Sequence, residues 1–227
     1  MLLAALTACG VAPHVAPLEP VPKAPLARPT RATVQLGCIG HPRIDVWERR
    51  LRERHGRTGI PTATAEREAE YLPRLQPLVA AGGLPRGLAL LPVIESGFRP
   101  RARGRAGEGG LWQLRPATAR RFGLIVTHQK DERFVPERAT RAAVRYLAYL
   151  HARYRDWPLA LAAYNAGEGR IDRALARRPR ASFWELAHAG LVPRRSRQYV
   201  PRFLALVRLN EPGARDPPST RVARRGE

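Results

Sequence analysis

Residues 137–155, "ERATRAAVRYLAYLHARYR", are the stretch that decides the fold class, because they carry the clearest periodicity in the chain. Val144, Leu147, Leu150 and Tyr154 recur at intervals of three or four residues. Residues at this spacing fall on one side of an α-helix. The pattern therefore predicts an amphipathic helix whose apolar side faces a core.

Helix signals continue on both sides of this stretch. Asp156 precedes Trp157-Pro158, an order that favours a helix start, and Asn165-Ala166-Gly167 is typical of a helix end. Three more helices are predicted from apolar spacing and glycine stops, over "IDVWERRLRER" (44–54), over "YLPRLQPLVAAGG" (71–83) with Gly82 and Gly83 as its end, and around Phe203, Leu204 and Val207.

Strand patterns are nearly absent from the sequence. No convincing run of alternating apolar and polar residues is found, and only residues 123–136 allow a short β-hairpin. The predicted fold class is therefore all-α or nearly so.

The composition limits the classes of partner and site. The net charge is +21 and comes almost entirely from arginine, since Lys23 and Lys130 are the only lysines. Such a charge permits anionic partners, but no helix-turn-helix or stacking-aromatic pattern accompanies it, so nucleic acid is not the expected ligand. Two cysteines form neither a disulfide framework nor a metal cluster, and we expect no metal and no cofactor.

The two ends of the chain differ in composition from its middle. Leu6-Thr7-Ala8-Cys9 in "MLLAALTACG" (1–10) resembles a bacterial lipobox, which predicts lipidation of Cys9 and a cell-envelope location on the periplasmic side, as in an outer-membrane lipoprotein. Residues 11–35 predict a Pro-rich linker, 36–210 a folded domain and 211–227 a disordered tail.

The stretch "LALLPVIESGF" (88–98) raises a chemical question, because an apolar run ends in Glu95. Burying a carboxylate is costly unless it is paired or neutralised. The residues alone leave two interpretations open. Either a helix reaches the surface at Glu95 and the carboxylate is solvated, or the apolar flank surrounds an acid that is kept neutral for chemistry.

Four short segments, taken in order, indicate a family. They are "ESGF" from Glu95, "GGLWQLRPATARRFGL" from Gly109, "LALAAYNAGEGRI" from Leu159 and "QYVPRFLAL" from Gln198. In this order, with 18 residues from Glu95 to Gln113, they resemble the lytic transglycosylases of the goose-lysozyme-like superfamily, most closely the membrane-bound murein transglycosylase D type. The resemblance extends from about Ile44 to Asn210.

The resemblance implies a helical, lysozyme-like lobe with a groove for a glycan strand of peptidoglycan. Members of the family cleave the β-1,4 bond between N-acetylmuramic acid and N-acetylglucosamine without water and leave a 1,6-anhydromuramoyl end. By residue-to-residue match, Glu95 is the catalytic acid/base, while Gln113, Tyr164, Asn165 and Tyr199 line the groove or lie close to that acid. We expect a monomer that reaches the membrane through its lipid.

Two departures from the family pattern leave alternatives open. Gly104 stands where relatives usually have Ser, and Arg195-Ser196-Arg197 replaces an "ETR" run. A weakly active or non-catalytic peptidoglycan-binding scaffold is one alternative, and slow activity raised by Gly104→Ser is the corresponding expectation for an enzyme. A hydrolytic lysozyme is another, and it needs a second acid. The acids available for that role are Glu108, Asp131, Glu132 and Glu168.

Overall fold

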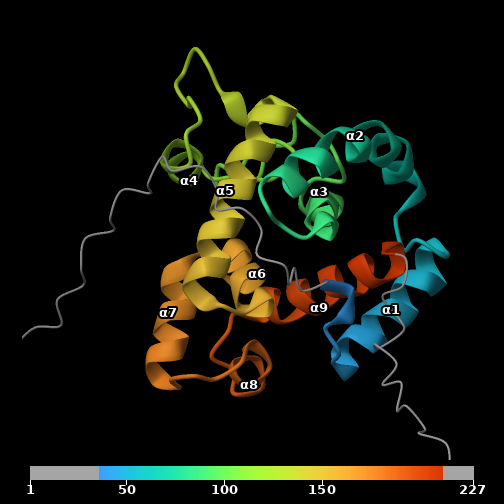
Figure 1. Cartoon of the computed structure of the whole chain (residues 1–227), viewed down its shortest axis with the longest axis vertical. Helices are drawn as coiled ribbons and strands as arrows, with labels where there is room; N and C mark the ends of the chain where they lie inside the picture. Colours follow the sequence, from blue (N-terminus) through green and yellow to red (C-terminus); the bar gives the residue numbers. More distant parts are fainter. Residues whose placement is uncertain (1–35, 212–227) are drawn as a thin grey trace, which may run out of the picture.

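The computed structural model describes residues 36–211, and the predicted lipobox, linker and nearly all of the predicted tail lie outside that range. The described elements, in chain order, are η1 (Leu36–Cys38), α1 (Pro42–His55), α2 (Thr62–Ala81), η2 (Arg86–Leu90), α3 (Leu91–Glu95), α4 (Pro116–Arg121), η3 (Glu132–Phe134), α5 (Pro136–Tyr154), α6 (Trp157–Ala166), α7 (Glu168–Arg177), α8 (Phe183–His188) and α9 (Arg194–Asn210). Figure 1 shows their arrangement.

Helix α5 runs through the middle of the molecule and packs against α2 and α6 (Figure 1). The predicted apolar stripe is confirmed for Val144, Leu147 and Leu150, which are buried, whereas Tyr154 is only partly covered. Helix α6 is buried along nearly its whole length. The core is therefore a stack of helices against which shorter segments pack.

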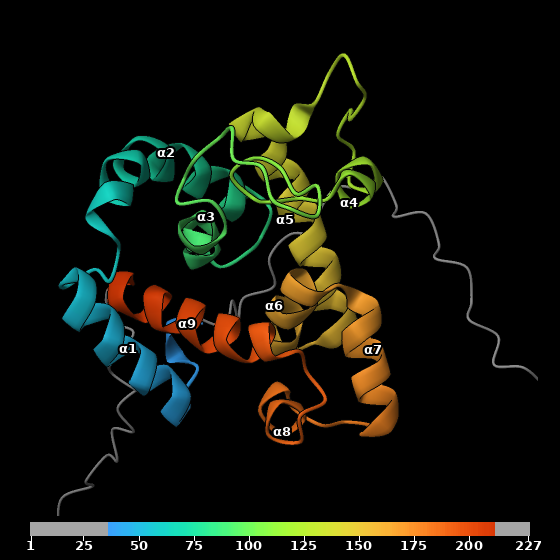
Figure 2. The ribbon, with the colours of Figure 1, turned by 180° about the vertical axis from the view of Figure 1, so that it is seen from behind.

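The two ends of the described chain lie together. Helix α9 packs against α1 and α6, and Figure 2 shows α1 and α9 side by side. Arg208 on α9 donates to the Asp45 carboxylate on α1 over 2.6 Å. Glu211, assigned by sequence to the tail, accepts a hydrogen bond from the Gly37 N–H over 3.2 Å, so the ordered fold extends to this residue.

Helix boundaries follow the predicted capping residues closely. The Asp156 side chain accepts a hydrogen bond from the Leu159 N–H over 2.6 Å, which caps α6 as the sequence predicted. Gly167 ends α6 with a φ of 88°, a conformation that favours glycine. Gly82 ends α2, although Pro73 and Pro77 lie within that helix.

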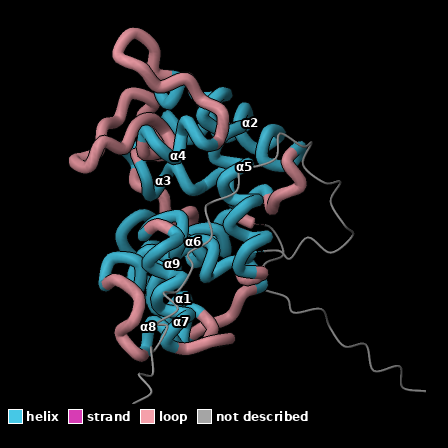
Figure 3. Tube along the Cα trace, turned by 90° about the vertical axis from the view of Figure 1, so that its left-hand side faces the viewer, coloured by secondary structure: helices cyan, strands magenta, loops and turns pink. Residues whose placement is uncertain are grey.

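No β-strand occurs within residues 36–211, and Figure 3 shows helices joined by loops only. Where a short hairpin was allowed by sequence, Val126 and Asp131 form an isolated antiparallel bridge. The loop between α3 and α4 has two further bridges of this kind, at Gly109. The all-α class is confirmed, and helices α4, α7 and α8 are additions that the sequence patterns did not single out.

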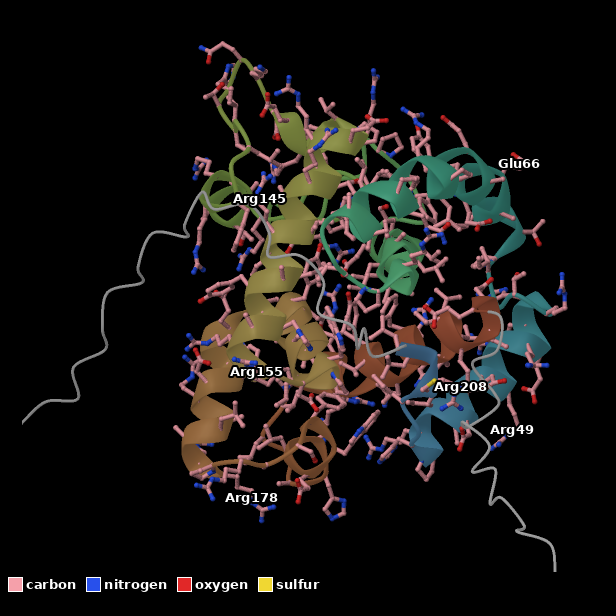
Figure 4. All side chains as sticks on the ribbon, viewed as in Figure 1. Arg49, Glu66, Arg145, Arg155, Arg178 and Arg208 are labelled. Atoms are coloured by element: carbon pink, nitrogen blue, oxygen red, sulfur yellow. The ribbon has the colours of Figure 1, made fainter. Side chains whose placement is uncertain are left out.

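The positive charge is spread around the molecule. The labelled arginines in Figure 4 come from α1, from the middle of α5, from the residues that directly follow α5 and α7, and from α9, and they lie on different sides of the ribbon. In the part of the chain between residues 36 and 211, no helix combines the length and the hydropathy needed to cross a bilayer.

Candidate active site

Glu95 is the last residue of α3, a helix of five residues that follows directly on η2. The apolar run before it is buried, including Leu88, Leu91 and Val93, and Phe98 after it is fully buried. Ser96 is also buried, and its hydroxyl donates to the Leu111 carbonyl over 2.9 Å. The short helix is therefore fixed in the core up to the residue that carries the carboxyl.

A pocket of about 320 Å³ opens at the end of α3. It brings together residues from α3, from the loop between α3 and α4, and from α6 and α9, which are far apart in the sequence. The lining residues are Glu95, Gly104, Arg105, Ala106, Glu108, Gln113, Tyr164, Asn165 and Arg195. Four of the five residues that the sequence proposed for the site thus share one pocket.

Tyr199 is the fifth, and it contacts Glu95 from α9 without being among the residues that line the pocket. Its side chain is 9% exposed, and its hydroxyl donates to Glu95 Oε1 over 2.5 Å. Within residues 36–211 this is the only hydrogen bond that the Glu95 carboxyl makes. Its second oxygen is therefore available to a ligand in the pocket.

The environment raises the pKa of Glu95 from the ordinary value of 4.5 to about 7. Burial is the main cause, because it disfavours the charged carboxylate. The hydrogen bond from Tyr199 and the charge of Arg195 act in the opposite direction, and the charge of Glu108 adds to the rise. A carboxyl with this pKa is partly protonated near neutral pH and is suited to donate a proton there.

Gln113 reaches the pocket from a strained turn. Its φ is 47°, which is uncommon for a residue other than glycine, and such conformations are often found at functional sites. Its side-chain amide donates to the Gly110 carbonyl over 2.8 Å and more weakly to the Ala102 carbonyl. Gly110 has a φ of 76°, and a Cβ there would lie 1.8 Å from the Arg133 carbonyl oxygen, so only glycine fits.

Tyr164 and Asn165 are held by neighbours on other segments. The Tyr164 hydroxyl donates to the Trp112 carbonyl over 2.7 Å, and the Trp112 indole in turn donates to the Thr140 hydroxyl on α5. Asn165 Oδ1 accepts a hydrogen bond from the Ser196 hydroxyl over 2.8 Å. Ser196 thus supplies a site contact from the segment where the sequence departs from the family's "ETR" run.

Arg195 and Glu108 are pocket residues that the sequence reasoning did not assign to the site. Glu108 was considered only as one of four acids for a hydrolytic alternative, and it alone of the four lines the pocket. Glu168 instead pairs with Arg121, Asp131 with Arg133, and Glu132 with Arg138. Residue type alone did not separate these acids, because it does not show which carboxylate faces the pocket and which is paired with an arginine.

The space beside Gly104 is filled by Glu108. A Cβ built on Gly104 would lie 2.3 Å from Glu108 Oε2, 2.9 Å from Glu108 Cβ and 3.0 Å from Gln113 Oε1. A serine at this position would overlap a carboxylate, so the structure argues against the predicted gain in activity from Gly104→Ser alone. The sequence reasoning treated position 104 in isolation and missed its neighbour four residues later.

The loop that carries Gly104 and Glu108 is anchored by buried Arg133. Its guanidinium donates to the Gly107 carbonyl over 2.6 Å and to the Leu114 carbonyl over 3.0 Å. The same side chain is paired with Asp131, and these contacts lower the pKa of the Asp131 carboxyl, mainly through the hydrogen bond.

No group of three or more His, Cys, Asp or Glu side chains that could hold a metal ion occurs within residues 36–211, the part of the chain that the structure describes.

Residues 77–187 match the family described as the Transglycosylase SLT domain. This chain carries an SLT domain. Glu95, Gln113, Tyr164 and Asn165 lie within the matched residues, whereas Arg195, Ser196 and Tyr199 follow them on α9. The pocket is therefore made by the SLT domain and completed by the last helix.

Two of the proteins similar to this SLT-domain chain are membrane-bound lytic murein transglycosylases by name. Membrane-bound lytic murein transglycosylase D of Escherichia coli K12 is 40% identical over 128 residues, which are 54% of this chain and 27% of that protein. Membrane-bound lytic murein transglycosylase F of Pseudoalteromonas translucida is 37% identical over 116 residues, 46% of this chain and 23% of that protein. The chain thus spans about a quarter of the length of each.

A solved structure has a similar fold. The lytic transglycosylase Slt of Pseudomonas aeruginosa, crystallised as an inactive Glu-to-Gln mutant, superposes with a TM-score of 0.50 and is 29% identical. The superposition covers 61% of this chain and 23% of that one. The SLT domain here accordingly has the helical fold of a lytic transglycosylase.

Proposed function

We propose that this protein is a peptidoglycan lytic transglycosylase with Glu95 as its sole acid/base. The bond cleaved is the β-1,4 linkage between N-acetylmuramic acid and N-acetylglucosamine, and the product carries a 1,6-anhydromuramoyl end. The observation that carries this proposal is the Glu95 carboxyl, which has a pKa raised to about 7 and one unbonded oxygen in the SLT-domain pocket.

The chemistry needs one carboxyl that acts twice. Protonated Glu95 donates its proton to the glycosidic oxygen, and the resulting carboxylate then removes the proton of the C6 hydroxyl as that oxygen closes on C1. The substrate's own N-acetyl group stabilises the cationic centre. No water is consumed, and this distinguishes the reaction from ordinary glycosidase hydrolysis with its two carboxylates.

Other residues of the pocket hold the sugar and the acid. Gln113, Tyr164 and Asn165 bind the glycan, and the Asn165 side chain is oriented by Ser196. Tyr199 acts through Glu95, because its hydroxyl occupies Oε1 and leaves Oε2 to carry the proton into the pocket. Arg105 and Arg195 line the same pocket and suit a polymer whose peptide stems bear carboxylates.

The test is digestion of purified murein sacculi in heavy-oxygen water, followed by mass spectrometry of the muropeptides. We expect anhydro ends without label, and none with the Glu95→Gln protein. Labelled reducing ends as the main product would make the protein a hydrolase, for which Glu108 is the second carboxylate in the pocket. Binding to sacculi without any product would instead identify a scaffold.

For the cell location, we propose attachment to the envelope on its periplasmic side through a lipid on Cys9, with the domain acting as a monomer. The support is the lipobox-like sequence before Cys9 and the membrane-bound relatives. Protein expressed in cells should fractionate with membranes, and Cys9→Ser should release it. Equal soluble fractions for both proteins would rule out the lipid anchor.

A further inference from the structure

Gly104 and Glu108 both line the pocket, and the Glu108 side chain lies in the space that a side chain on residue 104 would need. The Glu108 side chain turns back over Gly104, because Oε2 lies where a Cβ on residue 104 would come within 2.3 Å of it. The same oxygen accepts a hydrogen bond from the Ala106 N–H over 3.0 Å. The backbone closes the turn, since the Gly104 N–H donates to the Glu108 carbonyl over 2.9 Å.

The glycine is not required by the backbone. Gly104 is not among the glycines with positive φ, so residues with a side chain can adopt its conformation. By contrast, Gly107 in the same turn has a φ of 82°. What a side chain at position 104 would lack is space, and Glu108 is the main neighbour that takes it.

We propose that Glu108 is a second functional carboxylate of this pocket, seated over Gly104 and facing the same cavity as Glu95, on which it acts by its charge. In this role Glu108 is a positioning residue, since it acts through Glu95. The inference rests on the proposed function of Glu95, and it adds a residue that the single-acid mechanism does not use.

The charged and titratable groups around Glu95 act in both directions, and Arg105 lines the same pocket. Tyr199 and Arg195 on α9 favour the ionised carboxylate by a hydrogen bond and by charge, respectively. Glu108, from the loop between α3 and α4, favours the protonated form. Tyr164 on α6 lines the same pocket, and the nearby Glu95 charge helps to raise the pKa of its hydroxyl, although burial is the main cause.

The first test addresses the shared volume by a double-mutant cycle on thermal stability. Gly104→Ser should lower the Tm in the presence of Glu108, and the loss should be much smaller in the Glu108→Ala background, because the largest overlap is then removed. Equal losses in both backgrounds would show that Glu108 does not occupy the space above Gly104, and would overturn the proposal.

The second test addresses the charge and does not depend on activity. The Glu95 carboxyl is titrated by carbon-13 NMR in the full chain, in Glu108→Gln and in Glu66→Gln, which removes an exposed carboxylate on α2. We expect Glu108→Gln to move the titration to lower pH by roughly half a unit and Glu66→Gln to leave it unchanged. An unchanged titration in Glu108→Gln would overturn the proposal.

The same variants are compared in murein digestion over a range of pH. The alkaline limb of the Glu108→Gln profile should move with the titration, and the rate above neutrality should fall about threefold. If Glu108→Gln changed the main product from a hydrolysed end to an anhydro end, Glu108 would be the base that activates a water molecule, and the proposed role would be wrong. A wild-type protein that makes no product would disprove the proposed function, while the titration would still decide the role of Glu108.

Discussion

Two carboxyls differ sharply in this molecule, half-buried Glu95 at the end of α3 and fully buried Glu132 at the start of η3. The side chain of Glu132 is 2% exposed, yet its oxygens accept from the Ile125 N–H and from Arg138, and Lys130 lies 3.1 Å away. Glu95 accepts one hydrogen bond from residues 36–211, from a neutral tyrosine hydroxyl. The cost of desolvating the Glu132 carboxylate is thus offset by a backbone donor and by cations, whereas Glu95 has only the tyrosine hydroxyl as a donor.

The pKa values of the two carboxyls respond in opposite directions. The backbone N–H and the cations around Glu132 lower its pKa, whereas burial raises that of Glu95 to about 7. Burial alone therefore does not define a functional acid. A desolvated carboxyl without a cation in direct contact is costly for the fold, and such a cost is typical of groups that serve catalysis.

The largest expected effect is on turnover. Glu95→Gln keeps the shape and the Tyr199 contact but cannot relay a proton, so the rate of murein cleavage should fall at least about a thousandfold. Glu132→Gln is the matched control. Per folded molecule, it should cleave murein at most of the wild-type rate. Retention of more than about a tenth of the wild-type rate by Glu95→Gln would place the acid elsewhere.

The next effect is on stability and depends on pH. The folded pKa of Glu95 is about 7 against an ordinary 4.5, so the folded state holds a proton that the unfolded state has lost between these values, and stability falls as pH rises through this window. Glu95→Gln should therefore stabilise the protein at about pH 8 by up to about 3 kcal/mol, and hardly at all at about pH 4.

Urea unfolding at both pH values measures this difference. Glu132→Gln should lower stability at about pH 8, because it leaves buried and cationic donors without their carboxylate. At about pH 8 the two substitutions should therefore change the free energy of unfolding in opposite directions, an increase for Glu95→Gln and a decrease for Glu132→Gln. If both substitutions destabilised the protein at about pH 8, Glu95 would be as well compensated as Glu132.

A smaller effect is expected at Tyr199. Tyr199→Phe removes the hydrogen bond from the tyrosine hydroxyl to Glu95 and should lower the rate about three- to tenfold, the equivalent of one hydrogen bond. Because this bond lowers the pKa of Glu95, its loss should also move the alkaline limb of the pH–rate profile to higher pH. A limb that moved to lower pH would show that the hydroxyl does not stabilise the carboxylate.

The smallest effect is expected for a pair at the surface. Arg153 and Asp172 lie 2.9 Å apart, with side chains 40% and 36% exposed. Arg153→Gln should change the free energy of unfolding by about 0.5 kcal/mol or less, because water screens such pairs. A much larger loss in urea unfolding would mean that solvated pairs contribute as much as the ones around Glu132.

The sequence by itself determined the helical class, several helix ends and the candidate acid. Apolar residues at helical spacing in 144–150 and the cap at Asp156 depend on neighbours within a few residues, so they can be read along the chain. The motifs around Glu95, Gln113 and Tyr164 could likewise be matched one by one, and the pocket does contain these residues.

Only the tertiary structure decided how these residues act on one another. The Tyr199 hydroxyl meets Glu95 across 104 positions of sequence, and Ser196 reaches Asn165 across 31, contacts that no local pattern specifies. Glu108 is close to Gly104 in sequence, but whether its side chain turns into the pocket depends on the turn that Arg133 anchors. Burial, and with it the raised pKa of Glu95, is a property of packed neighbours, which is why the sequence could name a candidate acid but not its protonation state.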